Sequence, residues 1–320
     1  MRRIAVVTSG GDAPGMNAAI RAITRFACAS GMEVLGFERG WEGLIYNRFR
    51  QLTPRSVGGI IHLGGTVLHT SRCPEFKRPE CVRMAAENLA ADGVEGLVVI
   101  GGDGSMRGAR DLALQTGALV VGVPASIDND VYGTDETIGF DTAVNTCVSE
   151  IDKIRDTAIS HERVFVVEVM GRRRGFLALT VGLTVGAEVI LVPEAPLNME
   201  EVCRTVKENA AKGKKTGIIV AAEGVGDTRR IAEQLEANTK AEVRLSIIGY
   251  AQRGGSPTAR SRLLANLFSK EAVDLLSSHI GGRVVGLQKG EVKSITLEEA
   301  CSKEKPLDLS LLEVAKTLAT

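Results

Sequence analysis

Short apolar runs rich in β-branched residues alternate with helix-length segments along almost all of this 320-residue chain. The runs are apolar on both faces, as strands of a parallel sheet must be when helices cover both sides. The predicted strands are residues 4–8, 97–101, 119–123, 164–169, 189–192, 217–221 and 244–248. The predicted helices are residues 17–30, 80–91, 106–115, 141–158, 199–211 and 258–277. This order predicts a doubly wound α/β fold with mostly parallel sheets.

The overall composition excludes several classes of protein. Thirty-nine basic residues balance 39 acidic ones, which argues against a nucleic-acid or membrane-surface binder with a net positive charge. Six scattered cysteines without a C-x-x-C pair indicate reduced thiols and no zinc site. The apolar stretch 175–192 contains Glu188, so we expect a buried helix followed by a strand there. These features predict a cytoplasmic protein.

A glycine-rich loop follows the first predicted strand, at residues 10–15. Backbone N–H groups of such a loop, together with the N-terminus of the next helix, can bind an anion. The loop is not a Walker A motif, because Met16 stands at the lysine position, and the chain has no G-x-G-x-x-G. The alternative is a tight turn without a ligand.

Two further polar loops follow apolar strands. In 101–105, Asp103 lies between glycines and has room to bind Mg²⁺ through water, or it caps the next helix. In 124–130, Asp128 and Asp130 are two residues apart, and in an extended segment they would project to the same side. Asp128 as a general base supported by Asp130 is one interpretation, and a turn rich in Asp and Asn is the other.

Basic residues follow several of the predicted strands. Arg172 and Arg253 each stand beside glycines, where a phosphate can be bound. Isolated charges of this kind are more often solvated surface residues.

Taken together, these motifs resemble those of the bacterial ATP-dependent 6-phosphofructokinases. The similar segments appear in that family's order and cover the whole chain: residues 8–12, 101–105, 127–130, 160–163, 168–172 and 252–257. The resemblance implies a two-lobed fold with helices on both faces of each sheet. It places an ATP-binding lobe in 1–138 plus 253–304, and a fructose 6-phosphate-binding lobe in 139–252 plus 305–320.

The resemblance implies the glycolytic transfer of a phosphoryl group from ATP to the 1-hydroxyl of fructose 6-phosphate, giving fructose 1,6-bisphosphate and ADP. Asp128 would be the base, and Asp103 would bind Mg²⁺. The implied catalytic residues are Asp128, Arg172, Ser126, Gly11 and Arg72. The implied ATP-binding residues are Gly11, Arg72, Cys73, Gly102, Asp103, Gly104 and Ser105. The implied substrate-binding residues are Ser126, Ile127, Asp128, Arg163, Met170, Gly171, Arg172, Glu223, Arg244, Tyr250 and Arg253.

The resemblance also implies a homotetramer, with Arg163 and Arg244 reaching the sugar phosphate of a neighbouring subunit. An allosteric effector would bind between subunits at Arg21, Arg25, Arg155, Glu188, Lys212 and Lys214. Gly59 and Pro54 depart from that effector pattern, so we expect a weak response to ADP. Tyr250 stands where the family usually has His; a phenol cannot carry a positive charge at neutral pH, which favours weaker sugar-phosphate binding.

Two alternatives to an ATP-dependent enzyme stay open. Pyrophosphate-using members of the family tend to carry Asp at the position of Gly104 and Lys at that of Ala125, so these two small residues favour ATP. A catalytically idle paralogue that only binds nucleotide or sugar phosphate is the other alternative. The presence of Asp103, Asp128 and Arg172 argues against it.

Overall fold

The computed structural model describes residues 1–319 and divides into two compact units. Unit 1 combines Met1–Thr142 with Arg253–Lys305, and unit 2 combines Ala143–Gln252 with the chain from Pro306 onward. The chain therefore passes between the units three times, and each unit is built from two separate stretches of sequence.

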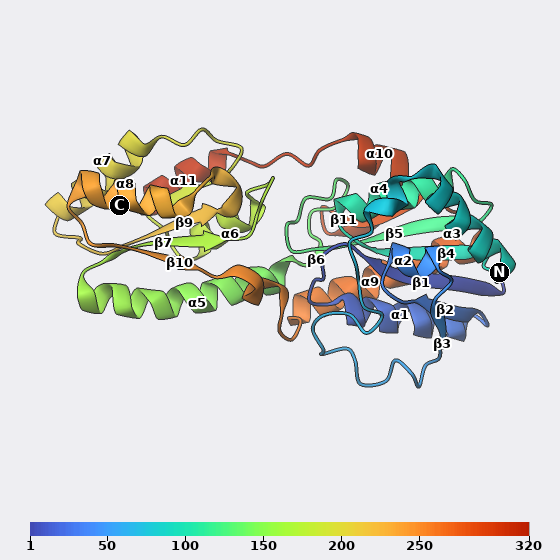
Figure 1. Ribbon diagram of the computed structural model, residues 1–320. Helices are drawn as coiled ribbons and strands as arrows, with labels where there is room; N and C mark the ends of the chain where they lie inside the picture. Colours follow the sequence, from blue (N-terminus) through green and yellow to red (C-terminus); the bar gives the residue numbers. More distant parts are fainter. Residues whose placement is uncertain (320) are drawn as a thin grey trace. The chain divides into compact units, whose positions relative to one another are not determined.

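Unit 1 contains an eight-stranded sheet in the order β12-β11-β5-β4-β1-β2-β3, with β6 paired to β5 (Figure 1). The central pairs are parallel, whereas the edge pairs β2–β3 and β11–β12 are antiparallel. Its strands are β1 (Arg3–Ser9), β2 (Glu33–Phe37), β3 (Phe49–Leu52), β4 (Gly96–Gly101), β5 (Leu119–Ser126), β6 (Ile138–Gly139), β11 (Arg283–Gln288) and β12 (Glu291–Thr296).

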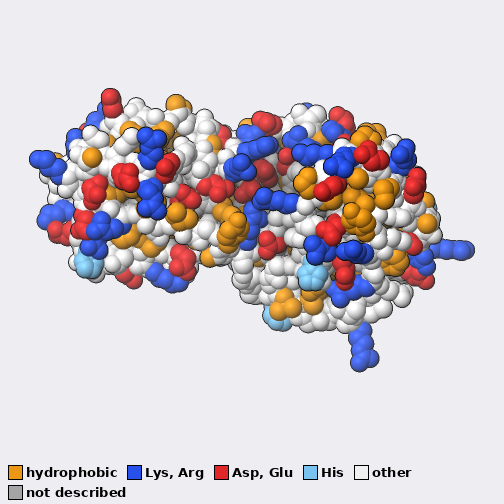
Figure 2. Space-filling model, in the orientation of Figure 1, with side chains coloured by type: hydrophobic (Ala, Val, Ile, Leu, Met, Phe, Trp, Pro, Cys, Tyr) orange, Lys and Arg blue, Asp and Glu red, His pale blue; other side chains and the backbone are white. Residues whose placement is uncertain are grey.

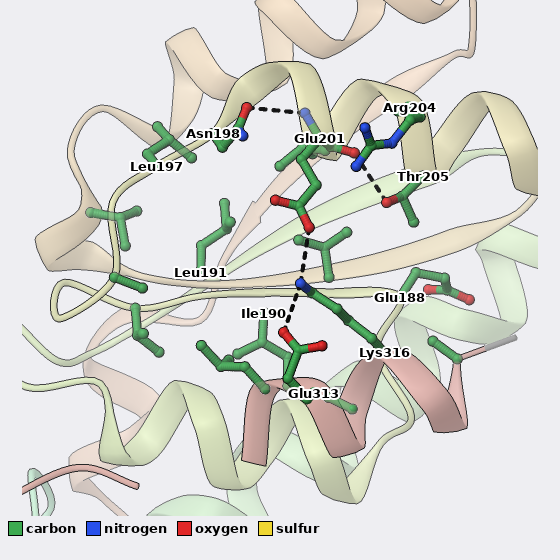
Figure 3. Close-up of a pocket in the computed structure, with 18 of the residues that line it drawn as sticks. Glu188, Ile190, Leu191, Leu197, Asn198, Glu201, Arg204, Thr205, Glu313 and Lys316 are labelled. Carbon is green, nitrogen blue, oxygen red and sulfur yellow. Dashed lines mark hydrogen bonds and ion pairs between the residues drawn. The ribbon is translucent and has the colours of Figure 1, made fainter. Parts of the chain in front are cut away.

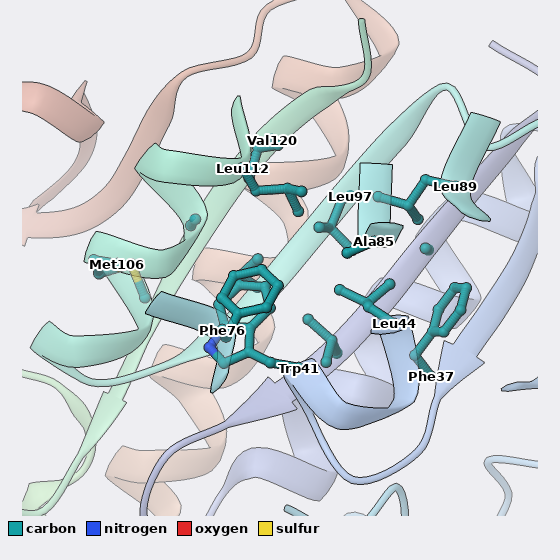
Figure 4. Close-up of a cluster of buried hydrophobic side chains, with 14 of the residues drawn as sticks. Phe37, Trp41, Leu44, Phe76, Ala85, Leu89, Leu97, Met106, Leu112 and Val120 are labelled. Carbon is teal, nitrogen blue, oxygen red and sulfur yellow. The ribbon is translucent and has the colours of Figure 1, made fainter. Parts of the chain in front are cut away.

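Helices cover both faces of this sheet. They are α1 (Met16–Ala29), α2 (Trp41–Ile45), α3 (Pro79–Ala91), α4 (Asp103–Ala113), α9 (Ala259–Ser277) and α10 (Leu297–Ser302), with a 3₁₀ turn η1 (Pro74–Lys77). On the face of α2, α3 and α4, Trp41 stacks on Phe76 with ring centroids 4.2 Å apart, and Leu44, Leu97 and Met106 complete the core (Figure 4).

Unit 2 contains a four-stranded, fully parallel sheet in the order β10-β7-β9-β8. Its strands are β7 (Val164–Val169), β8 (Val189–Leu191), β9 (Gly217–Ala222) and β10 (Val243–Ile247). Its helices are α5 (Phe140–His161), which begins in unit 1, α6 (Phe176–Thr184), α7 (Met199–Ala211), α8 (Thr228–Thr239) and α11 (Ser310–Leu318), with 3₁₀ turns η2 (Glu223–Val225) and η3 (Gly249–Arg253). Side chains of α7 and α8 pack on one face of the sheet, where Val206 and Leu235 meet Val166 and Ile219.

All seven predicted strands and all six predicted helices are present, and the predicted mostly parallel α/β fold is confirmed. The stretch 175–192 forms α6 followed by β8, as expected. The sequence pattern missed β2, β3, β6, β11 and β12. Strands β3 and β12 lie at the sheet's two edges and carry exposed polar side chains, so they lack the continuous apolar run of a central strand.

The surface matches the balanced composition. On the face shown in Figure 2, basic and acidic side chains are interspersed over both units. All six cysteines are free of disulfides. Among residues 1–319, no helix is long and apolar enough to cross a membrane.

The core of unit 1 gives a direct stability test at Leu97, which lies in β4 and is 0% exposed. Replacing it with Ala leaves a cavity and lowers the free energy of unfolding by about 2–5 kcal/mol. Urea unfolding followed through Trp41, the single tryptophan, measures this change. The control is Leu114→Ala, at a residue that is 79% exposed, which changes the free energy by less than about 0.5 kcal/mol. Equal effects of the two substitutions would contradict the assigned core.

Candidate active site

Three polar loops of unit 1 lie side by side where parallel strands end. Ser9 at the end of β1 is in register with Gly101 of β4, and Gly101 is in register with Pro124 of β5. The buried hydroxyl of Ser105 donates a 2.9 Å hydrogen bond to the carbonyl oxygen of Ser9, which fastens the second loop to the first. In open parallel sheets this edge is where ligands bind.

The first loop runs from Ser9 into helix α1. Gly10 and Gly15 have φ of +86° and +114°, in the left-handed region that glycine adopts without strain. Gly11 lies against the guanidinium group of Arg253, whose Nη1 donates to the carbonyl oxygen of Asp12 at 3.2 Å. The structure thus brings together Gly11 and Arg253, which are far apart in the sequence.

The second loop leads into α4, which begins at Asp103 with Gly102 as its N-cap residue. No side chain caps this helix, so the alternative interpretation of Asp103 as a capping residue is wrong. Its carboxylate instead pairs with Arg107, one turn further along, at 3.0 Å. Gly104 faces open space: a Cβ atom at this position would meet nothing within 4 Å.

The third loop begins at Ser126, beside Gly102, where a Cβ atom on the glycine would lie 3.4 Å from the serine side chain. The expectation that Asp128 and Asp130 share an extended segment is wrong, because β5 ends at Ser126 and Asn129 has φ of +53°. The Asn129 side chain is buried; its Oδ1 accepts from Thr137 N at 3.0 Å and its Nδ2 donates to Asp135 O at 3.2 Å.

Asn129 therefore shapes the turn that carries Asp128, a role that the sequence analysis did not assign. An asparagine between two aspartates was the available signal, since Asn is one of the few residues that tolerate this conformation. Asp128 itself donates its backbone N–H to the Ser126 hydroxyl at 3.1 Å.

The other predicted residues of unit 1 differ in exposure. Arg72 is exposed, and Ile127 is buried. The Cys73 thiol is partly buried, and this burial raises its pKa. Its Sγ lies 3.6 Å from a carboxylate oxygen of Glu75.

Unit 2 brings a second group of predicted residues together. Val169 of β7 is in register with Ala222 of β9, so the loops that follow these strands are neighbours. Gly224 N donates to Gly171 O at 3.2 Å, which joins the loop of Met170, Gly171 and Arg172 to the loop of Glu223. Arg172 and Glu223 are exposed.

Arg163 and Arg244 share one acidic partner. Arg163 pairs with Glu242 at 2.8 Å, and Arg244 pairs with the same carboxylate. The hydrogen bond from Arg163 holds the pKa of Glu242 below its usual value, with further lowering from Arg244. The two arginines that the sequence assigned to a phosphate thus already converge on a negative charge.

Gln252 is a second residue that the sequence analysis missed. Its side chain is 0% exposed: Oε1 accepts from Met170 N at 2.9 Å and from Cys147 Sγ at 3.3 Å, and Nε2 donates to Gly249 O at 2.9 Å. It therefore fixes the backbone of Met170 to the turn η3. In that turn Tyr250 is 81% exposed.

The six predicted effector residues are distributed over both units. Arg21 and Arg25 lie on α1 of unit 1, where Arg25 Nη2 lies 3.5 Å from Pro54 O. In unit 2, Arg155 donates to Val185 O, and Lys214 pairs with the buried carboxylate of Glu188 at 2.8 Å.

A cavity of about 590 Å³ in unit 2 is lined by Glu188 and Lys212 together with residues of α7 and α11 (Figure 3). Lys316 of α11 lies between Glu201 and Glu313 and is 2.9 Å from a carboxylate oxygen of each. The residues predicted to be catalytic lie outside this lining.

The residues present fit a magnesium ion that is held by one protein carboxylate and otherwise by water and substrate phosphates. Within the described part of the chain, no three His, Cys, Asp or Glu side chains are grouped so as to hold a metal. Mg²⁺ usually binds one or two carboxylates, several waters and substrate phosphates. Asp103 is half-buried at an open, glycine-lined edge, so it suits such a site.

The role of Gln252 can be tested directly. Gln252→Ala leaves the partly buried Met170 N–H without its partner, which costs about 1–3 kcal/mol locally. We expect the Met170 amide to exchange with solvent about tenfold faster, since about 1.4 kcal/mol corresponds to that factor. Hydrogen–deuterium exchange mass spectrometry of residues 164–175 measures this rate. Gln234→Ala on the exposed face of α8 is the control. An unchanged exchange rate in Gln252→Ala would show that the side-chain amide of Gln252 does not hold the loop at Met170.

Comparison with known proteins identifies the family. The phosphofructokinase family model matches residues 3–276. ATP-dependent 6-phosphofructokinases of Lysinibacillus sphaericus and Bacillus cytotoxicus are 51% and 50% identical over 319 residues, covering 100% of this chain and of theirs. The structure of phosphofructokinase from Saccharomyces cerevisiae superposes with a TM-score of 0.88 at 32% identity, covering 100% of this chain and 48% of the yeast chain. The chain belongs to the phosphofructokinase family.

Proposed function

We propose that the chain is an ATP-dependent 6-phosphofructokinase, which transfers a phosphoryl group from ATP to the 1-hydroxyl of fructose 6-phosphate. The observation that carries this proposal is the full-length identity of about 50% to bacterial enzymes with that name. The three adjacent loops of unit 1 support it, because they retain Asp103 and Asp128 after neighbouring strands. Phosphoryl transfer depends mainly on positioning and charge neutralisation, which such loops supply.

On the donor side, we assign the nucleotide phosphates to the loops at Gly11 and at Gly102–Ser105. Glycines there let backbone N–H groups approach an anion, and the N-terminus of α4 adds a partial positive charge. Asp103 would hold Mg²⁺ together with water and phosphate oxygens. When bound, the ion neutralises part of the phosphate charge. Arg72 and Cys73 complete the proposed ATP site.

On the acceptor side, Asp128 would take the proton of the 1-hydroxyl, and Ser126, beside Gly102, would contact the transferred group. Arg172 would stabilise the charge that develops on it. Met170, Gly171 and Glu223 would contact the sugar, since their two loops are joined in unit 2.

The 6-phosphate would be bound by Arg163, Arg244 and Arg253. Because Glu242 holds the first two, the phosphate would compete with this carboxylate for them. It stays a prediction that Arg163 and Arg244 reach the substrate of a neighbouring subunit. The tetramer, the effector site and the cytoplasmic location also stay predictions.

Asp128→Asn tests the reaction. The amide keeps the size of the side chain but cannot accept the hydroxyl proton, so we expect kcat to fall by about 10²–10⁴-fold. A coupled assay that detects ADP formation with fructose 6-phosphate and MgATP measures this rate. Asp111→Asn, which removes an exposed carboxylate on α4, is the matched control. Turnover by Asp128→Asn at the normal rate would refute the base assignment. Absence of turnover by the unaltered chain with any donor would favour the idle paralogue.

Gly104 gives a separate test of the choice between ATP and pyrophosphate. A Cβ atom fits there, so Gly104→Ala should retain nearly full activity with ATP. Gly104→Asp adds a negative charge beside the proposed phosphate site, and we expect kcat/KM for ATP to fall about tenfold or more. Equal losses of activity with ATP in both variants would mean that the size of the side chain at position 104, and not its charge, limits ATP use. Turnover of the unaltered chain with pyrophosphate as fast as with ATP would overturn the donor assignment.

A further inference from the structure

The carboxylate of Asp103 is held by Arg107 within the same helix. Arg107 Nε lies 3.3 and 3.2 Å from the two carboxylate oxygens, and Nη2 lies 3.2 and 3.0 Å from them. The hydrogen bonds and charge of Asp103 raise the pKa of the guanidinium above its ordinary value. Both oxygens of the proposed metal ligand thus face a cation that belongs to the protein.

This ion pair is easily broken. The Arg107 side chain is 51% exposed and that of Asp103 is 28% exposed, so water and salt screen the pair. Exposed pairs at this helical spacing contribute only about a twofold preference for the paired state. In the part of the chain that the structure describes, Arg107 has no other ion pair, so nothing else holds its charged group in place.

Arg107 is also directed toward the anion-binding end of its helix. Side chains on a helix point back toward its N-terminus, and the contact with Asp103 at the first position of α4 shows that Arg107 does so. At that end Gly104 leaves open space. A guanidinium group released from Asp103 therefore stays within reach of any phosphate bound at the N-terminus of α4.

From these contacts we propose that Arg107 and the metal ion exchange partners. Without nucleotide, Arg107 neutralises Asp103. When a magnesium–nucleotide binds, Asp103 would hold the metal ion, and the guanidinium of Arg107 would be free to contact the nucleotide's phosphates. This inference rests on the proposed function and deepens it, because it makes Arg107 a residue that determines affinity for the magnesium–nucleotide donor.

The proposal predicts opposite effects on two ligands. Arg107→Met removes the charge and retains much of the side-chain length. Binding of Mn²⁺ alone, measured by electron paramagnetic resonance on the purified full-length chain, should become at least about twofold tighter, because the competitor of the metal is gone. Binding of MgATP, measured by calorimetry, should become about tenfold weaker, because a charge-assisted contact is lost.

Two further variants make the experiment decisive. Arg110→Met is the matched control: Arg110 lies three residues further along α4 and pairs with Asp111, so both affinities should stay unchanged. Arg107→Lys retains the charge and should bind MgATP more tightly than Arg107→Met. It also provides the comparison with the unaltered chain if the methionine variant does not fold.

A merely structural role for Arg107 would change both affinities in the same direction or neither of them, and either result would overturn the proposal. Binding of MgATP by the unaltered chain without phosphorylation of fructose 6-phosphate would refute the proposed function alone. The opposite changes in affinity would still be expected in that case, because both measurements are made without turnover.

Discussion

The proposed chemistry depends on one constraint: three parallel strands, β1, β4 and β5, end in register at the same edge of the sheet. Because Ser9, Gly101 and Pro124 are aligned, the loops that follow them cannot separate without breaking strand pairing. The bond from the Ser105 hydroxyl to Ser9 O fastens the first two loops, and it is buried, so water does not compete for it. A rigid edge of this kind can position a phosphate chain and an acceptor hydroxyl, and positioning is most of what phosphoryl transfer requires.

Charged residues in both candidate sites are paired within the protein, and we propose that a ligand displaces one partner of each pair. Asp103 pairs with Arg107 in unit 1, and Glu242 pairs with Arg163 and Arg244 in unit 2. Arg107 carries a positive charge like the metal ion proposed to bind Asp103. Glu242 carries a negative charge like the phosphate proposed to bind Arg163 and Arg244. Surface ion pairs contribute little to stability, so exchanging them costs little. The balanced composition of the chain is therefore compatible with binding two phosphorylated substrates.

Strands β1, β4 and β5 and the four strands of unit 2 could be predicted from the sequence, because a buried parallel strand needs a continuous apolar run. Strands β3 and β12 could not, since an edge strand with one solvated face shows no such run. The loop residues of the site followed from their positions after strands and from family motifs. The triple contact of Gln252 did not, because its partners Met170 and Cys147 are distant in the sequence. The asparagine in 127–130 was a signal for a turn, but the hydrogen bonds that hold Asn129 at positive φ join it to Asp135 and Thr137, outside that motif. The pairing of Arg163 with Glu242 was missed for the same reason: the two residues directly precede the adjacent strands β7 and β10 and are 79 positions apart in the sequence.

The most direct test of the central claim is a crystal structure of the chain with MgADP bound. We expect phosphate oxygens within hydrogen-bond distance of the backbone N–H groups of Gly11 and of the first turn of α4, with the metal ion beside Asp103. A nucleotide bound instead in the unit 2 cavity between α7 and α11, or a metal ion held away from Asp103, would contradict it.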